Sequence, residues 1–175
     1  MSRRVSLNAR QMQDAQASPE IEVVLFYITH PELSSPIRLS TDNKDELSLD
    51  PYIRGTRSTW MGSNPITEGF AHIIAEAVLP SDMDDAPAAG QIALALVDQA
   101  LVTAVRAVST VPTVHIAVVL ASSPNLIEYE VRDLDIVSHD IGADQVILTF
   151  SRADIENDPC PAGRMTKDSF PGLHK

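Results

Sequence analysis

The stretch EIEVVLFYIT, residues 20–29, predicts a β-strand and does more than any other segment to decide the fold class. Side chains along a strand alternate between its two faces, and here both sets are nearly all apolar. The first set is Ile21, Val23, Leu25 and Tyr27, and the second set is Glu22, Val24, Phe26 and Ile28. A strand with a solvated face would carry polar residues at every second position, so we expect this strand to be covered on both faces.

Most of the remaining chain also has strand patterns separated by turn residues. Strands are predicted over residues 37–40, 46–54, 66–79, 91–98, 112–121, 126–139 and 145–151. Segment 46–54 is expected to follow the polar turn 41–45 and to pair back as the second strand of a hairpin, and the last two strands form another hairpin. For residues 66–79 a helix is the alternative, and Gly69 with the aliphatic content favours a strand.

Two helices are expected beside the strands. Residues 6–17 form the first, which ends where Ser18 precedes Pro19, because the residue before a proline avoids the helical conformation. Residues 99–109 form the second, since their apolar side chains recur at helical spacing after Asp98, a favourable N-cap residue.

This order of elements predicts a mainly β (α+β) fold. We expect an antiparallel β-sandwich or barrel with an N-terminal helix, one central helix and an extended C-terminal arm. A chain of 175 residues is long enough for one domain with a substantial core, and we place that domain at residues 1–154. Residues 155–175 form the arm, because three prolines and two glycines leave too few apolar side chains for a separate core.

Charge and composition restrict the classes of partner. The sequence has 24 acidic and 13 basic residues, a formal net charge of -11, whereas tight binding to nucleic acid needs clustered positive charge. The longest apolar stretches, 23–28 and 114–121, are too short to cross a bilayer, and the N-terminus lacks the apolar run of a signal peptide. We therefore expect synthesis in a cytoplasm, no specific nucleic-acid binding and no membrane insertion.

Residue types that catalyse reactions or bind metals occur without the spacing that such sites need. The five histidines are His30, His72, His115, His139 and His174. None has a metal-ligand spacing, and those at 72 and 115 are interpreted as satisfied core or sheet-face residues within apolar strands. Cys160 is a lone cysteine between two prolines, and Asp82, Asp84 and Asp85 do not follow the calcium-loop pattern. We predict no catalytic residue, no metal, no cofactor and therefore no enzyme.

Four segments carry a further signal. They are SLNARQMQDAQAS (6–18) continuing into IEVVLFYITHPELSSPIRLSTD (21–42), IALALVDQALVTAVRAV (92–108), VPTVHIAVVLASSPNLIEYEVRDLDIVSHD (111–140) and CPAGRMTKDSFPGL (160–173). The closing Phe-Pro-Gly-Leu is the most specific piece. In this order, over nearly the full chain, the segments resemble a family of small minor tail proteins of long-tailed bacteriophages.

The resemblance implies a position in a virion rather than catalysis. A protein of this family is expected to be a baseplate or distal-tail ring subunit that connects the tail tube protein to the tail-tip hub protein. Such rings are homo-oligomers, with sixfold symmetry favoured and threefold symmetry possible. The expected location is the virion tail, after synthesis in the host bacterial cytoplasm.

Two regions are candidate functional surfaces under this interpretation. The acidic loop with Asp82, Asp84 and Asp85 is expected to face the tail lumen, where negative charge repels DNA within a Debye length of about 8 Å. The C-terminal arm is expected to dock on a neighbouring subunit. Its interface candidates are Met165, Phe170, Pro171 and Leu173.

A receptor- or glycan-binding module of the tail tip is the first alternative function. Such a module needs exposed aromatic side chains that stack on sugar, and the candidates are Trp60, Tyr52 and Tyr129. Aromatic residues make up only 5% of the chain, which favours the structural subunit. A cell-wall hydrolase is the second and less favoured alternative, because the sequence has no recognisable nucleophile or metal constellation.

Overall fold

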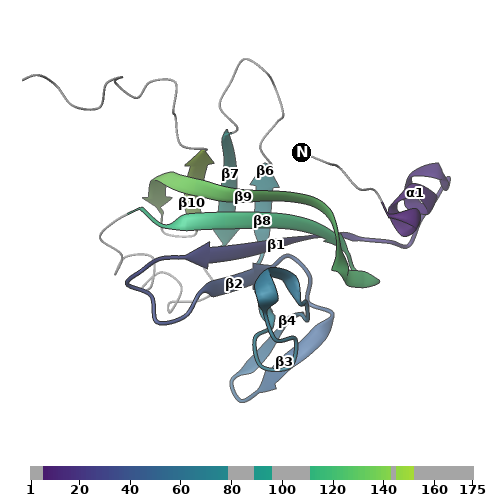
Figure 1. Ribbon diagram of the computed structural model, residues 1–175, viewed down its shortest axis with the longest axis horizontal. Helices are drawn as coiled ribbons and strands as arrows, with labels where there is room; N and C mark the ends of the chain where they lie inside the picture. Colours follow the sequence, from purple (N-terminus) through teal and green to yellow (C-terminus); the bar gives the residue numbers. More distant parts are fainter. Residues whose placement is uncertain (1–5, 79–88, 96–110, 143–144, 152–175) are drawn as a thin grey trace, which may run out of the picture.

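The computed structural model describes residues 6–78, 89–95, 111–142 and 145–151 (Figure 1). Strands make up most of these residues, which confirms the prediction of a mainly β fold. The strands are β1 (Glu22–Thr29), β2 (Ile37–Ser40), β3 (Asp45–Leu49), β4 (Tyr52–Thr56), β5 (Phe70–His72), β6 (Ala75–Val78), β7 (Ala89–Ala95), β8 (Thr113–Leu120), β9 (Ser123–Ile141) and β10 (Gln145–Ser151). The predicted first helix is confirmed as α1 (Leu7–Asp14), and a 3-10 helix, η1, spans Trp60–Gly62.

The ten strands of the described residues form one mixed sheet, in the order β3-β4-β5-β2-β1-β8-β9-β10-β7-β6. Neighbouring strands are antiparallel except β2 and β5, which run parallel. Because β3 and β6 lie at the two ends of this order, the sheet is not closed, and the described strands do not form the barrel that was one of the two expected arrangements. The sandwich stays a prediction.

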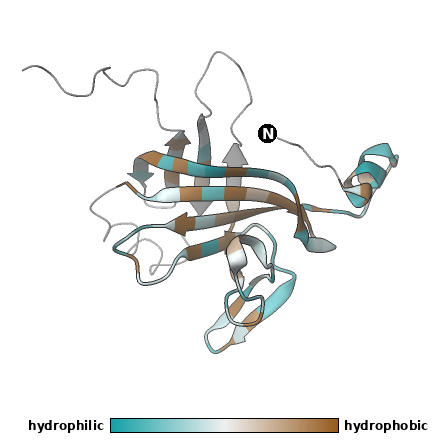
Figure 2. Ribbon diagram, in the orientation of Figure 1, coloured by the Kyte–Doolittle hydropathy of each residue, from teal (hydrophilic) through white to brown (hydrophobic). Residues whose placement is uncertain are grey.

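The central strand β1 is covered on both faces, as its sequence predicts. Phe26 and Ile28 lie in one core cluster, whereas Val23 and Leu25 lie in a second cluster on the opposite face. All four side chains are buried. Figure 2 shows β1 as a largely hydrophobic ribbon, in keeping with a strand that has no solvated face over most of its length.

The sheet bends strongly between its middle and its β6–β7–β10 end. In Figure 1 these three strands run across the direction of β1 and β8, and the 19-residue strand β9 connects the two regions. Phe150 and Leu148 of β10 and Ile92 of β7 therefore join Phe26 and Ile116 in the first core cluster. The predicted hairpin of 126–139 with 145–151 is confirmed by the antiparallel pairing of β9 with β10.

The predicted pairing of segment 46–54 with the strand before it is wrong. This segment is itself a hairpin, in which β3 pairs with β4, and β2 pairs instead with β1 and β5. The physical reason is the Asp50-Pro51 step in its middle, because a proline has no backbone N–H for a strand ladder and favours a turn.

Residues 66–78 confirm the strand interpretation and contradict the helical alternative. They contain two short strands rather than one, because the chain leaves the ladder at Ile73 and Ile74. Ile73 is buried in the first core cluster, whereas Ile74 is exposed. β5 consequently pairs with β2 and β4, while β6 lies at the far end of the sheet beside β7.

Several predicted elements lie outside the described residues. They are the acidic loop, the central helix at 99–109 and the C-terminal arm. Of the helices in the described ranges, none has the length and apolar character that crossing a membrane requires.

Candidate functional site

Residues 57–68 form a covering segment across one face of the sheet. Trp60 is its main apolar contact, with only 4% of its surface exposed. The indole stacks on Phe70 of β5 with 5.9 Å between ring centroids, and it meets Tyr27 of β1 edge-on at 6.1 Å. Its Nε1–H donates to Glu130 Oε1 on β9 at 2.7 Å, so the polar atom of this buried ring has a partner.

The start of the covering segment is anchored to the first residues of β9. The Ser58 hydroxyl donates to the carbonyl oxygen of Pro124 at 2.7 Å. The backbone N–H of Thr59 donates to Asn125 Oδ1 at 2.9 Å. These two bonds join parts of the chain that are 66 residues apart, and they hold Trp60 over the second core cluster.

The three aromatic residues considered for a glycan-binding module do not come together. Trp60 is buried beneath its own segment, and Tyr129 packs against the core cluster of the opposite face. Tyr52 is exposed, in the β3–β4 hairpin. Because stacking on sugar needs exposed rings on one surface, this geometry gives no support to a binding site built from these three rings.

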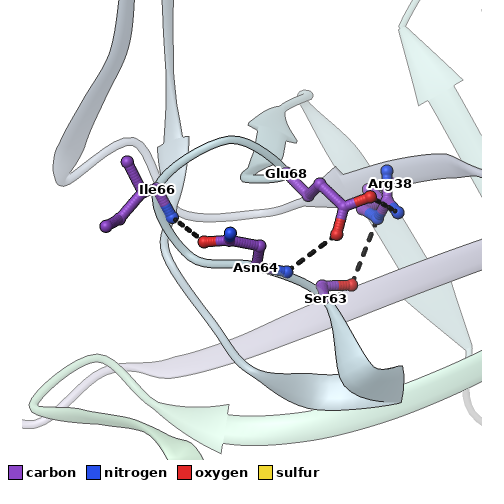
Figure 3. Close-up of polar contacts among 5 residues, drawn as sticks. All are labelled: Arg38, Ser63, Asn64, Ile66 and Glu68. Carbon is purple, nitrogen blue, oxygen red and sulfur yellow. Dashed lines mark hydrogen bonds and ion pairs between the residues drawn. The ribbon is translucent and has the colours of Figure 1, made fainter.

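The end of the covering segment, residues 63–68, is closed by a polar network around Arg38 of β2 (Figure 3). Arg38 Nη2 donates to Glu68 Oε1 at 2.9 Å, and Arg38 Nε donates to Ser63 Oγ at 3.1 Å. The second Glu68 oxygen accepts the Asn64 backbone N–H at 2.8 Å. This backbone hydrogen bond, followed by the positive charge of Arg38, lowers the pKa of Glu68 below its ordinary value. The carboxylate is therefore ionised, and the network is formed, at neutral pH.

The loop built by this network presents Ile66 to solvent. The Ile66 backbone N–H donates to Asn64 Oδ1 at 3.0 Å, which fixes the turn, and 78% of the residue's surface is exposed. In Figure 3 the Ile66 side chain points away from the Arg38–Glu68 pair. A single exposed apolar side chain is common on protein surfaces, so Ile66 bears on function only together with other exposed apolar residues held by the same framework.

Arg57 connects this loop to the β3–β4 hairpin. Its Nη1 donates to the carbonyl oxygens of Pro65 and Ile66 at 2.8 and 3.2 Å, and its Nη2 donates to that of Glu46 in β3 at 2.7 Å. Its backbone N–H donates to Asp45 Oδ2 at 3.2 Å. The loop and the end strand of the sheet are therefore fixed relative to each other.

The β3–β4 hairpin exposes apolar side chains next to its turn. Leu49 and Tyr52 face each other across the two strands and are 77% and 61% exposed. Ile53 is also exposed. Figure 1 shows the hairpin projecting from the body of the sheet. Because side chains alternate along a strand, Ile53 lies on the other face of the hairpin from Tyr52. We define the hairpin–loop surface as Leu49, Tyr52 and Ile66.

Close backbone packing fixes the base of the hairpin. A Cβ on Gly55 of β4 would lie 1.9 Å from the carbonyl oxygen of Phe70 in β5. A Cβ on Gly69 would lie 2.4 Å from Leu47 Cδ2. Only glycine fits at either position without a shift of its neighbours, so the hairpin lies against β5 with Leu47 over the two glycines.

The structure does not place most of the site residues predicted from the sequence. The acidic-loop candidates Asp82, Asp84 and Asp85, the arm candidates Met165, Phe170, Pro171 and Leu173, and the residues Cys160 and His174 lie outside the described residues. Within the described ranges, no group of three or more His, Cys, Asp or Glu side chains could hold a metal ion.

Of the two strand histidines, His115 is buried and satisfied as predicted, whereas His72 is exposed at the end of β5. His115 Nδ1 accepts the backbone N–H of Asp133 at 3.1 Å. His30 is likewise buried, and its Nδ1 accepts the Glu32 backbone N–H at 3.0 Å. In both histidines the ring nitrogen that accepts a backbone hydrogen bond ties the side chain to the local backbone.

Sequence reasoning missed the hairpin–loop surface. The signal that could have found it is the pairing of turn residues with apolar neighbours, at Asp50-Pro51 between Leu49 and Tyr52 and at Asn64-Pro65 before Ile66. Apolar side chains beside such a turn are not covered by neighbouring strands and therefore stay exposed.

Comparison with family models and with curated proteins identified no related protein. No family model matches the sequence, and no curated protein matches it. The residue pattern and the geometry described above are therefore what a functional proposal has to explain.

Proposed function

We propose that this protein is a structural, non-enzymatic subunit of a bacteriophage tail, a baseplate or distal-tail ring subunit that connects the tail tube to the tail-tip hub. The observation that carries the assembly role is the hairpin–loop surface, whose apolar side chains are exposed on an ordered framework. The tail position comes from the sequence resemblance.

The ion pair and hydrogen bonds that hold the loop of residues 63–68 support a role in binding, because they fix the loop in one conformation. Arg38 and Glu68 form an ion pair in which the arginine side chain is only 14% exposed, and Arg57 ties the loop to β3. These contacts limit the conformations of Ile66 before any partner arrives, and pre-organisation reduces the entropy that binding would otherwise lose. β3 adds the backbone groups of a strand at the end of the sheet.

A ring is compatible with one such surface on each subunit. A contact between two different patches of identical chains closes into a ring when the rotation per subunit divides a full turn. Sixfold symmetry is favoured and threefold is the alternative, as the resemblance implies. The net charge of -11 suits a particle through which DNA passes, with Asp82, Asp84 and Asp85 toward the lumen.

We extend the proposal to the arm and to the sheet. Met165, Phe170, Pro171 and Leu173 would add contacts with a neighbouring subunit. The bent sheet would pack as the two layers of a sandwich, which is supported by the presence of Phe26 of β1 and Phe150 of β10 in one core cluster.

The test uses the full chain and a matched pair of variants. Ile66→Asp combined with Tyr52→Asp places two charges on the hairpin–loop surface, and Val137→Asp places one on a similarly exposed apolar residue of β9. Light scattering and pull-down with the tail tube and tail-tip hub proteins would measure assembly. We expect the double variant to fold, by circular dichroism, and to lose ring formation or partner binding, while the control retains both. Normal assembly by the folded double variant would overturn the assigned surface.

A further inference from the structure

The pairing of β8 with β9 contains a bulge opposite a buried histidine. Val114 of β8 pairs with Leu134 of β9, and Ile116 pairs with Val131. His115 is the single β8 residue between these two pairs, and it faces two residues on β9. Those two are Arg132 and Asp133. Such bulges locally disrupt the ladder and re-aim side chains.

Asp133 gives this bulge an unusual backbone. Its φ of 58° lies in the left-handed region, which non-glycine residues adopt at a cost and which aspartate tolerates better than most. Its backbone N–H donates to His115 Nδ1 at 3.1 Å, instead of to a carbonyl oxygen of a regular ladder. The bulge therefore depends on an imidazole nitrogen that carries no proton.

Protonation of His115 is incompatible with this contact. A proton on Nδ1 would place two N–H donors against each other, and the side chain is only 9% exposed, so water cannot readily separate them. The Asp133 carboxylate lies 3.9 Å from Nδ1 and is 85% exposed, so it is free to turn toward a protonated ring. An acceptor for the imidazolium is thus available once the backbone bond is broken.

The surroundings of His115 include several charged or titratable groups. The centroid of the Tyr27 ring of β1 lies 6.1 Å from that of His115, and the Arg38 guanidinium of β2 lies over the Tyr27 ring, 5.5 Å from its centroid. From β9 come Asp133, Arg132 and Glu130. Burial lowers the pKa of His115 below its ordinary value, Asp133 and Glu130 act to raise it, and Arg132 acts to lower it.

The bulge is joined to the covering segment. Arg132, one of its two residues, donates from Nε to Glu130 Oε1 at 2.7 Å, and the same oxygen accepts the Trp60 indole N–H. A change in the bulge backbone therefore reaches the contact that holds Trp60 over the second core cluster.

We propose that His115 is an acid-sensitive latch of the β8–β9 bulge, whose protonation breaks the Asp133 backbone contact and loosens the cover formed by Trp60. In the proton balance, one proton from solvent binds Nδ1, and the resulting imidazolium donates to the Asp133 carboxylate. The device does not depend on the assembly role proposed above.

The sign of the effect follows from the direction of the pKa change. The folded latch binds the proton less tightly than an open or unfolded chain, whose histidine has the ordinary value of 6.5. The latch is therefore fully stable above that pH and loses stability as the pH falls below it. One pH unit below 6.5 the open population rises by up to about tenfold relative to the closed one.

The test follows the latch by two readouts in the full-length protein. Amide exchange of Asp133, corrected for the intrinsic rate, and fluorescence of Trp60, the single tryptophan, are measured from about pH 7.5 to about pH 5. We expect Asp133 to lose protection by up to about thirtyfold over this range, with a parallel change in the fluorescence. Glu130→Gln removes the carboxylate that contacts Trp60 but keeps the His115–Asp133 contact, so the Asp133 exchange transition should persist. It should move to somewhat lower pH, because the Glu130 charge acts to raise the pKa of His115.

His115→Asn is the decisive variant. An asparagine oxygen can occupy the place of Nδ1 and accept the Asp133 N–H, but it does not titrate in this range, so both readouts should become flat. Asp133→Asn should move the wild-type transition to lower pH, because it removes a charge that favours the imidazolium. A flat wild-type profile, or a transition that persists in His115→Asn or is unmoved in Asp133→Asn, would overturn the latch.

Discussion

Two glycines beside Leu47 allow the base of the hairpin to be tested by a pair of similar substitutions with different expected outcomes. In Gly69→Ala the new Cβ meets a side chain, at 2.4 Å from Leu47 Cδ2. In Gly55→Ala it meets backbone, at 1.9 Å from the carbonyl oxygen of Phe70. Each clash is far inside van der Waals contact. Leu47→Ala removes the clash at Gly69, whereas at Gly55 it removes only a 2.9 Å contact with Leu47 Cδ1 and leaves the clash with the Phe70 backbone.

The magnitudes follow from what can move. Forcing one extra carbon into a packed site costs about 1–3 kcal/mol. We expect the cost of Gly55→Ala to lie at or above the upper end of this range, because the clash with the Phe70 carbonyl oxygen is relieved only if β4 separates from β5. Gly69→Ala should cost about 1–2 kcal/mol, since Leu47 can shift its side chain. With Leu47→Ala as background, Gly69→Ala should become neutral or stabilising by up to about 1 kcal/mol, because alanine restricts the unfolded chain more than glycine does.

The assay is a double-mutant cycle on the free energy of unfolding. Urea unfolding of the wild type, the three single variants and the two double variants is followed by circular dichroism and by Trp60 fluorescence, which reports directly on the stacked Phe70. The coupling of Gly69→Ala with Leu47→Ala should be favourable by about 1–2 kcal/mol. The coupling of Gly55→Ala with Leu47→Ala should be much smaller, because the Phe70 carbonyl clash remains.

Equal losses for the two glycine variants, with no difference in their coupling to Leu47→Ala, would refute the reasoning. That outcome would mean that the hairpin base is loosely packed and that β4 can move away from β5 at little cost. The hairpin–loop surface would then lack the rigid support on which its proposed role depends.

Three further predictions concern β9. Burial alone raises the pKa of Glu130, but hydrogen bonds from Trp60 and Arg132 and the arginine charge lower it overall. The ionised Glu130 therefore stabilises the folded state above the ordinary value of 4.5, and this stabilisation is lost as the pH falls through the lower pKa of the folded state. Acid unfolding of Glu130→Gln should therefore depend less on pH below that value. Glu128→Ala should lower the free energy of local opening of α1 by about 0.5–2 kcal/mol, because Glu128 Oε2 accepts the Ser6 N–H at the helix start. Amide exchange of α1 would measure this change. Asp133→Gly should be tolerated, whereas Asp133→Val should lose about 1–3 kcal/mol in urea unfolding, because only the first suits a positive φ.

Controls separate these effects from general destabilisation. For α1, Glu22→Ala removes an exposed carboxylate of β1 and should leave helix exchange unchanged. If it loosened α1 as much as Glu128→Ala does, the tether would be disproved. For Glu130, an acid profile of Glu130→Gln identical to that of the wild type would show that the Trp60 contact is not linked to protonation.

Periodicity alone was enough to predict the central strands. The two apolar faces of β1 require covers on both sides wherever the strand lies, so the burial of Phe26 and Leu25 in different clusters could be predicted without knowing the neighbours. The β9–β10 hairpin was equally accessible, because its pairing is local and its turn contains Gly142.

The sequence also indicated strand character for residues 66–78, but not the two places that the strands occupy. β5 and β6 are separated by only two residues, yet they lie far apart in the sheet order. The break at Ile73 and Ile74 has no proline or glycine to mark it. It arises because Ile73 is needed in a core whose other members come from distant strands.

The residue pattern by itself determined that the chain is mainly β, that β1 is buried on both faces and that His115 belongs to a sheet. These follow from alternation, which is a property of neighbouring residues. Only the tertiary structure decided that Ser6 meets Glu128, that Trp60 meets Glu130 and that Arg38 fixes the loop that exposes Ile66. Such contacts join residues 30 to 122 positions apart, and they depend on which strands become neighbours when the whole sheet minimises its exposed apolar surface.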